Sequence, residues 1–340
     1  MQTKTKKLLV IRLSAMGDVA MTIPVLKAIL AQNRNLQITV LTRPFFIPIF
    51  KELRGVSIII IDTKNKHKGI AGLYKLYKTL KKERFFAIVD LHNVLRTNIL
   101  KFFFFGKNFY QINKGRKEKK DLISGKKKVQ LQSTHKRYAA VFKKIGLTVE
   151  IDNPIFLEKQ PLPKEITALL KNKKTKQLIG IAPFAAHKGK MYPLKQLKIV
   201  LKKISKNHIV LLFGGKNDAT QLEQLVINEN IFSIAGKLNF TAELQTISNL
   251  DLMLSMDSGN GHLAANYGVK VLTIWGVTHP FAGFAPFNQP TGYALTPDLN
   301  QFPKIPTSIY GNTYPKGYER AAGSISPEQV VEKIEKILKN

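Results

Sequence analysis

The sequence predicts an α/β protein with two Rossmann-like domains in succession. Its 340 residues are about twice the length of a domain of roughly 150 residues. Short apolar strand segments alternate with segments of helical apolar spacing, and this alternation occurs twice. Such a pattern is typical of parallel sheets covered by helices on both faces. We therefore predict domains over 1–160 and 161–325, followed by a C-terminal helix over 326–340.

The first predicted domain begins with a regular alternation. In order, we expect a strand over 8–13, a turn over 14–18, a helix over 19–32, strands over 36–41 and 56–61, a helix over 72–82 and a strand over 86–90. From 101 to 137 the periodicity is lost, and we interpret this segment as basic loops with an aromatic stretch. A helix over 136–145 follows, and three prolines indicate a linker over 153–163.

The second predicted domain repeats the alternation. In order, we expect a strand over 177–182, a helix over 194–204, a strand over 208–213, a helix over 221–227, a strand over 231–234, a helix over 241–248, a strand over 252–255, a helix over 260–266 and a strand over 271–274. A final helix over 326–338 would have Ser326 as its N-cap and Pro327 in its first turn. Ligands of open α/β sheets bind at the carboxyl ends of the strands, so we expect an interdomain cleft.

The composition restricts the chemistry. The chain has no cysteine and 7 histidines, none of them in a metal-binding pair, so we predict no metal site and no cofactor. The net charge is +32, and residues 1–160 hold 33 basic and 10 acidic residues, a net of +23. This field favours nucleic acid, anionic lipid or an anionic substrate as the partner, unless the source organism simply favours lysine. No segment has the length and apolar character of a signal peptide or a membrane span.

Two motifs place charged side chains after strands. Ser14-Ala15-Met16-Gly17-Asp18 would put Asp18 at the carboxyl edge of the first sheet, where it acts either as a general base or as a helix N-cap. His187-Lys188-Gly189-Lys190-Met191-Tyr192-Pro193 brings Lys188 and Lys190 to a strand-to-helix loop. Lysines there can bind a diphosphate, although a solvated charge run in a lysine-rich chain is the simpler interpretation.

Two further motifs contain paired glycines. Gly214 and Gly215 follow a strand and allow a ligand to approach the backbone, and Asp218 could bind ribose hydroxyls, but an ordinary turn has the same signature. Asp257-Ser258-Gly259-Asn260-Gly261-His262-Leu263-Ala264-Ala265 follows a strand and opens a helix. A helix N-terminus with Ser258 and Gly259 favours an anion, and Asp257 either caps the helix or binds sugar hydroxyls. A plain capped helix start remains the alternative.

These motifs, in this order, resemble the ADP-heptose:lipopolysaccharide heptosyltransferase family, glycosyltransferase family 9. The family's S-x-M-G-D turn matches 14–18, and its D-[ST]-G-x-x-H-L-A-A helix start matches 257–265. Its K-x-W/Y-P, Phe-Gly-Gly and I-S-P-E-x-V elements match 190–193, 213–215 and 325–330. The resemblance spans nearly the whole chain, and the ordered set is more specific than any single motif.

The resemblance implies a GT-B fold with the acceptor on the N-terminal domain and the nucleotide sugar on the C-terminal domain. It implies an inverting, metal-independent transfer with Asp18 as the base, and Lys190, Ser258 and Gly259 on the donor diphosphate. Asp257 would contact the donor sugar, and His262 would support the helix start. The chain departs from the family at Ala185 and Ala186, where hydroxyl side chains are common, and it has no cysteine over 301–322. His187 or Lys188 could replace the lost phosphate contacts.

The resemblance and the charge together predict the partners. We expect ADP-heptose as the donor and an anionic lipid-linked saccharide as the acceptor, bound in part by Arg96 and Arg116. The basic segment 114–128, with the aromatic stretch 102–105 upstream, would hold the protein at the inner face of the inner membrane on the cytoplasmic side. A buried strand or helix is the simpler interpretation of the stretch 102–105. A nucleic-acid-binding protein and an inactive scaffold are the alternatives, although no nucleic-acid-binding motif is recognised.

Overall fold

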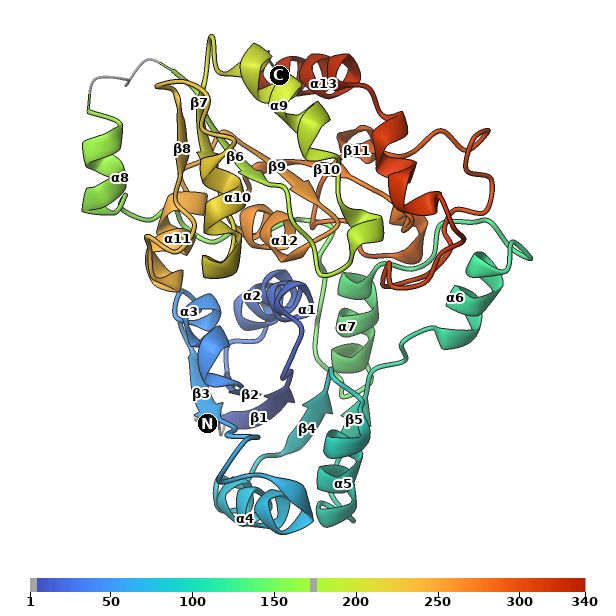
Figure 1. Cartoon of the computed structure of the whole chain (residues 1–340). Helices are drawn as coiled ribbons and strands as arrows, with labels where there is room; N and C mark the ends of the chain where they lie inside the picture. Colours follow the sequence, from blue (N-terminus) through green and yellow to red (C-terminus); the bar gives the residue numbers. More distant parts are fainter. Residues whose placement is uncertain (1–4, 172–175, 340) are drawn as a thin grey trace. The chain divides into compact units, whose positions relative to one another are not determined.

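The chain divides into two compact units. A computed structural model describes residues 5–171 and 176–339, so the outer limits predicted at 1 and 340 lie outside the described residues (Figure 1). One unit is formed by Met1–Lys114 and Thr134–Leu157, and the other by Gly115–Ser133 and Glu158–Asn340. The boundary near 157 lies close to the one expected at 160. Gly115–Ser133, however, groups with the second unit, whereas the expected boundary assigns it to the first.

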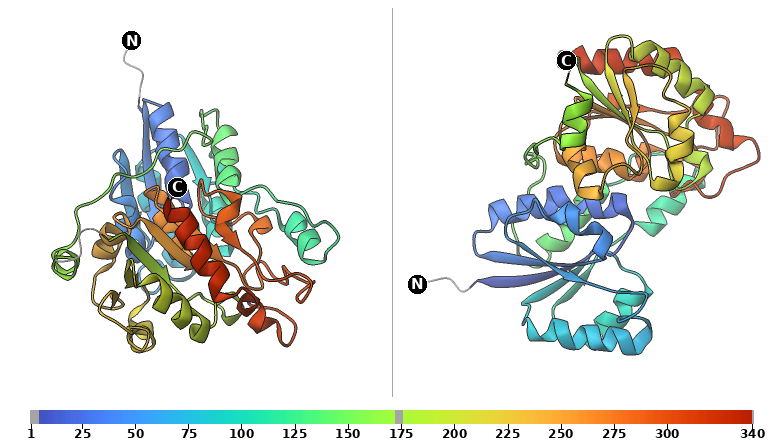
Figure 2. Two further views of the ribbon diagram at one scale, coloured as in Figure 1. Left: turned by 90° about the horizontal axis from the view of Figure 1, so that it is seen from above. Right: turned by 60° about the vertical axis from the view of Figure 1, so that its left-hand side comes forward.

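The first unit contains a five-stranded parallel sheet. Its order is β3 (Val56–Ile60), β2 (Leu36–Thr42), β1 (Lys6–Ile11), β4 (Ala87–Asp90) and β5 (Phe109–Gln111). Its helices are α1 (Met16–Ala20), α2 (Thr22–Gln32), α3 (Ile47–Phe50), α4 (Gly69–Lys82), α5 (Leu95–Phe103) and α7 (Thr134–Lys143). Figure 2 shows α4 and α5 on one face of this sheet, where Leu76 and Leu100 pack with Leu9 and Ile11. The alternation predicted for strands and helices up to residue 90 is confirmed.

Two local predictions in this part of the sequence are wrong. The helix expected over 19–32 is two helices, because Pro24 has no N–H to donate to the carbonyl of Ala20. The basic loops expected over 101–137 contain the end of α5, the strand β5 and the helix α6 (Arg116–Ile123). In α6 only Leu122 is buried, so its sequence carries no apolar period from which a helix could be predicted.

The second unit contains a six-stranded parallel sheet. Its order is β11 (Ala294–Leu295), β10 (Lys270–Ile274), β9 (Leu252–Met256), β6 (Leu178–Ala182), β7 (Ile209–Leu212) and β8 (Ile231–Ser233). Its helices, besides α6, are α8 (Lys164–Leu169), α9 (Leu194–Ile204), α10 (Ala219–Glu223), α11 (Phe240–Ile247), α12 (Gly259–Asn266) and α13 (Pro327–Lys339). The predicted order of strands and helices is confirmed, and the short strand β11 is an addition to it.

The closing helix α13 belongs to the core of the second unit. Ser326 is its N-cap as predicted, since its Oγ accepts the N–H of Gln329 at 3.2 Å and the Gln329 side chain accepts the N–H of Ser326 at 2.8 Å. Figure 1 shows α13 lying against α9. Ile334 and Ile337 of α13 are buried in the same apolar cluster as Leu197 and Leu201 of α9. Among the described residues, no helix combines the length and apolar character needed to cross a membrane.

Candidate functional site

Asp18 lies at the carboxyl end of β1, on the third residue of α1. Its Oδ2 is 2.5 Å from Nη2 of Arg12 and accepts the backbone N–H of Ala15 at 3.3 Å. The N-cap of α1 is Ala15, so Asp18 is not the N-cap considered from the sequence, although its carboxylate accepts the N–H of that N-cap residue. The ion pair is an additional feature. The Asp18 side chain is 28% exposed, so a substrate can still reach the carboxylate. Its assignment as the general base stays a prediction.

Arg12, the ion-pair partner of Asp18, was not selected by the sequence analysis. It is buried, donates from Nη1 to the Leu91 carbonyl at 2.6 Å, and has its guanidinium 5.9 Å from the ring centre of Tyr138. Tyr138, which is also buried, donates its hydroxyl to the Asp18 carbonyl at 3.3 Å. A buried charge requires a partner. The sequence signal for this pair is a single arginine at the end of an apolar strand. Asp18, six residues later, is the only acidic residue nearby in the sequence.

His92 lies beside this pair at the end of β4. Burial, followed by the positive charges of Arg12 and Lys114, lowers the pKa of His92 from 6.5 to about 3. The buried Asp90 carboxylate orders the turn, since Oδ1 accepts the N–H groups of His92 and Asn93, each at 2.9 Å. His92 is therefore a neutral imidazole near neutral pH, packed next to a charged guanidinium.

This environment predicts an acid-dependent loss of stability. Since the folded-state pKa of His92 lies below that of the unfolded chain, the unfolded state binds more protons as the pH falls from about 6.5 towards 3. Stability is then complete above pH 6.5 and declines below it. His92→Gln should make the melting temperature fall less steeply between pH 7 and pH 4.5, measured by thermal unfolding. His187→Gln, at a partly exposed histidine, is the control, and parallel curves for His92→Gln and the wild type would refute the assignment.

In the second unit, Lys190 and Asp257 form an ion pair. Lys190 ends a short 3₁₀ helix after β6, and Asp257 follows β9. Nζ of Lys190 is 2.9 Å from Oδ2 of Asp257, and the Thr278 hydroxyl donates to the same oxygen at 2.8 Å. The two charged side chains are 13% and 9% exposed. The structure therefore joins two residues that the sequence analysis selected from separate motifs, at the carboxyl ends of neighbouring strands.

Three glycines hold the backbone and the alkyl chain of Lys190 in place. The carbonyl of Gly189 accepts the N–H of Val277 at 2.8 Å, and a Cβ added to Gly276 would lie 2.0 Å from that carbonyl oxygen. Gly311 has φ +79°, and a Cβ there would lie 2.5 Å from Cγ of Lys190. Backbone segments can approach this closely only where no side chain intervenes. The loop over 301–322 thus contributes Gly311, which the sequence analysis did not select.

Ser258 occupies the N-cap position of α12, but its side chain makes no capping hydrogen bond. Its Oγ is buried and has no hydrogen-bond partner among the described residues, and no side-chain cap bond is formed. A buried hydroxyl without a partner is unfavourable, so this oxygen is suited to a polar ligand. Gly259 begins the helix, and His262 is buried one turn further along. The plain capped helix start considered from the sequence is therefore not what the structure has.

The other predicted donor residues have local structural explanations. Oδ2 of Asp218 accepts the N–H of Gly215 at 2.8 Å, and a Cβ on Gly214 would lie 2.6 Å from the Leu222 side chain. Capping and packing therefore account for this turn, and ribose binding stays a prediction. Lys188 is exposed, two residues before Lys190.

The two candidate acceptor arginines lie in different units. Arg96 is on α5 of the first unit and is partly buried, while Arg116 is exposed at the first position of α6, which groups with the second unit. Their roles stay predictions. Within 5–171 and 176–339, no group of three or more His, Asp or Glu side chains is arranged to hold a metal ion.

The sequence and the structure both resemble known heptosyltransferases. The chain is 24% identical over 339 residues to lipooligosaccharide heptosyltransferase 2 of Campylobacter jejuni, covering 96% of each chain. The structure resembles a family 9 glycosyltransferase from Veillonella parvula, with a TM-score of 0.78, 19% identity and coverage of 100% of this chain and 99% of the other. It also resembles Escherichia coli heptosyltransferase WaaC with ADP-2-deoxy-2-fluoro heptose, with a TM-score of 0.69, 14% identity and coverage of 97% and 99%.

A family model settles the classification that the motifs indicated. The model for glycosyltransferase family 9 (heptosyltransferase) matches residues 73–304, which is more than half of the chain. The structural relatives confirm the predicted fold class. The match favours the predicted enzyme over the nucleic-acid-binding alternative. The chain therefore belongs to glycosyltransferase family 9, the heptosyltransferase family, and is a glycosyltransferase with the GT-B fold.

Proposed function

We propose that the protein transfers a heptose from ADP-heptose to the core acceptor of lipopolysaccharide or lipooligosaccharide, with inversion at the anomeric carbon. The Campylobacter jejuni relative is a lipooligosaccharide heptosyltransferase, and a relative from Haemophilus influenzae, 25% identical over 305 residues, is a lipopolysaccharide core heptosyltransferase. WaaC has been solved with ADP-2-deoxy-2-fluoro heptose. The observation that carries the proposal is the Lys190–Asp257 ion pair in the unit that also presents the unpartnered Ser258 hydroxyl at the start of α12.

On the donor side, the leaving ADP gains negative charge as its bond to the sugar breaks. Lys190 supplies a cation, and the first N–H groups of α12 with the Ser258 hydroxyl supply donors for the phosphate oxygens. Asp257 is then free to bind a hydroxyl of the donor sugar while it keeps the hydrogen bond from Thr278. In this assignment, the diphosphate takes the place beside Lys190 that Asp257 occupies in the structure.

On the acceptor side, the attacking hydroxyl must lose a proton. Its oxygen forms the new bond to the anomeric carbon, the bond from that carbon to ADP breaks on the opposite face, and the proton passes to the Asp18 carboxylate. Arg12 fixes the direction of that carboxylate through their ion pair. Arg12 is therefore a positioning residue in this proposal, and Asp18 is the base.

A donor panel tests the proposed function. The protein is incubated with ADP-, GDP- and UDP-sugars, and the rise in its melting temperature is measured, since a ligand that binds the native state stabilises it. We expect ADP-heptose to give the largest rise and to be consumed only when a core acceptor is added. Stabilisation by another nucleotide sugar would reassign the donor. Binding without turnover for any donor would support the inactive-scaffold alternative.

We also expect turnover to continue in a chelator. The chain has no D-x-D motif, and Lys190 with the start of α12 can neutralise the diphosphate without a divalent ion. Initial rates with and without EDTA, on protein dialysed against the chelator, should agree within error. Loss of activity in EDTA that Mg²⁺ or Mn²⁺ restores would contradict the metal-independent mechanism.

The proposed site of action is the inner face of the inner membrane, on the cytoplasmic side. A lipid-linked acceptor is held in a membrane, and the +32 charge favours association with an anionic leaflet. Nucleic acid is not an expected partner of this function. The proposal is one of peripheral association, without a membrane-spanning segment.

A further inference from the structure

One edge of the first unit exposes large aromatic side chains. Phe102 and Phe105 are 75% and 92% exposed, and Ile70 and Tyr74 of α4 are 66% and 44% exposed. The rings continue from one to the next, because the Tyr74 and Phe102 ring centres lie 5.4 and 6.1 Å from that of Phe103. We call the outer side of α4 and of 95–109 the α4–α5 surface.

The fold does not require these exposed rings. Leu100 and Phe104 lie one helical turn apart and face the core, with 0% and 5% exposure. Phe102 and Phe105 are also one turn apart, and they point away from it. The sequence left open whether the stretch 102–105 is buried or makes apolar contacts at the surface. In the structure Phe104 is buried, and Phe102 and Phe105 are exposed. Contiguous exposed apolar side chains of this size mark interaction sites in soluble proteins.

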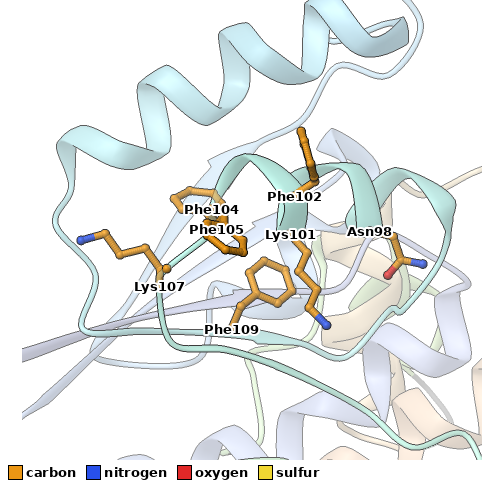
Figure 3. A pocket seen from close by; sticks show the side chains of 8 residues that line it. Asn98, Lys101, Phe102, Phe104, Phe105, Lys107 and Phe109 are labelled. Atoms are coloured by element: carbon orange, nitrogen blue, oxygen red, sulfur yellow. The ribbon is translucent and has the colours of Figure 1, made fainter.

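A pocket opens between the exposed rings. Its volume is about 310 Å³, and Figure 3 shows Phe105 and Phe109 in its lining, between Lys107 on one side and Lys101 on the other. Apolar walls flanked by two ammonium groups suit a molecule with an apolar part and an anionic part.

Positive charge surrounds the aromatic side chains. Residues 64–107 contain eleven basic and two acidic residues, and one of the acids, Asp90, is buried. Nζ of Lys78 is 4.8 Å from the ring centre of Tyr74, and Nζ of Lys81 is 5.6 Å from that of Tyr77. The exposed lysines of this surface are Lys75, Lys78, Lys81, Lys82, Lys101 and Lys107, and Lys64, Lys66 and Lys68 are exposed in the segment that precedes α4.

We propose that the α4–α5 surface docks on an anionic lipid leaflet. Phe102 and Phe105 enter the boundary between head groups and acyl chains, and the surrounding lysines bind lipid phosphates, as in other peripheral surfaces that combine apolar and basic side chains. The positive charge of the lysines is complementary to an anionic membrane. The exposed rings favour a lipid surface, because they can insert into it. The inference deepens the proposed function and rests on it, since it names the surface that brings the enzyme to a lipid-linked acceptor.

This assignment differs from the one based on the basic segment 114–128. That segment groups largely with the second unit. Its Lys128 donates to the Pro303 carbonyl at 3.0 Å, and Nζ of Lys119 is 4.2 Å from the ring centre of Phe284. Two of its lysines therefore have contacts within the second unit, and the segment contains no exposed aromatic residue that could insert into a membrane.

Sedimentation with vesicles tests the surface. We compare phosphatidylcholine vesicles with mixed phosphatidylcholine and phosphatidylglycerol vesicles, at low and high salt. The double variant Phe102→Ser/Phe105→Ser should bind mixed vesicles about tenfold more weakly or worse, because it loses both inserting rings. Lys101→Gln/Lys107→Gln should lose much of the preference for anionic lipid. Ile199→Ser, at a 45% exposed residue of α9 in the second unit, is the matched control and should bind like the wild type.

The outcomes separate this inference from the proposed function. Turnover on a deacylated, water-soluble acceptor should be the same in Phe102→Ser/Phe105→Ser as in the wild type. If the wild type does not bind anionic vesicles at low salt, or if the double variant binds them equally well, the docking surface is refuted while transferase activity is unaffected. The inference is also overturned if the wild type is oligomeric without lipid and the double variant is monomeric, because the surface then binds a second copy of the chain.

Discussion

Asp18→Asn is expected to lower turnover by about 10²–10⁴-fold while ADP-heptose binds nearly as well as to the wild type. The amide can still accept the Ala15 N–H, so the helix cap is retained, but it cannot take a proton from the acceptor hydroxyl. Turnover at saturating donor and acceptor, together with donor affinity by calorimetry, measures the two effects separately.

The same substitution leaves the buried Arg12 without its anionic partner, so a melting curve must accompany the rate. Asp62→Asn is a matched control, because Asp62 also caps a turn in the first unit, accepting the N–H groups of Lys64 and Asn65 at 3.1 and 3.0 Å. It should keep wild-type turnover. If Asp18→Asn also retains near-wild-type turnover while folded, Asp18 is a cap and the base lies elsewhere.

Lys190→Met is expected to weaken ADP binding by about 10–100-fold and to slow transfer, because a charge-assisted contact to the diphosphate is lost. It should also lower the free energy of unfolding by about 3 kcal/mol, since Asp257 becomes a buried carboxylate without its cation. The stability effect alone would be expected of any structural ion pair, so the binding measurement is the informative one.

A double variant separates the two effects of Lys190. Lys190→Met/Asp257→Asn removes both charges, so the melting temperature should recover while ADP affinity stays low. Recovery of both would assign Lys190 to structure alone. Lys188→Met, at the neighbouring exposed lysine, should have a much smaller effect on ADP binding, and a larger one would place the phosphate contact two residues earlier.

The sequence was sufficient to predict most of the sheets, because apolar runs such as those in β6 and β9 are buried along their whole length. It was insufficient where an element buries little. In α6 only Leu122 is buried, and β5 has three residues, so neither has a period that could be recognised. The grouping of Gly115–Ser133 with the second unit depends on contacts such as that between Leu131 and Phe281, which are distant in sequence.

The site could be predicted in its parts but not in its pairings. Asp18, Lys190 and Asp257 are each visible in a motif, since they follow strands at loops rich in glycine. The ion pair between Lys190 and Asp257 could not be inferred from the sequence, because the two residues are 67 positions apart. They meet only because β6 and β9 are neighbours in the sheet. Arg12 is recognised as the partner of Asp18 only once its own side chain, directly after β1, is seen to be buried.

The close packing of Gly189, Gly276 and Gly311 around Lys190 has an entropic consequence. A lysine side chain that is free in solution loses about 1.5–2 kcal/mol of rotational freedom when it is fixed. Here Gly311 and the ion pair to Asp257 already restrict the Lys190 chain before any ligand arrives. The Lys190 side chain therefore loses most of its conformational entropy when the protein folds. For the diphosphate contact proposed for Lys190, this restriction removes an entropic penalty equivalent to about tenfold in affinity, which offsets part of the loss of the ion pair to Asp257.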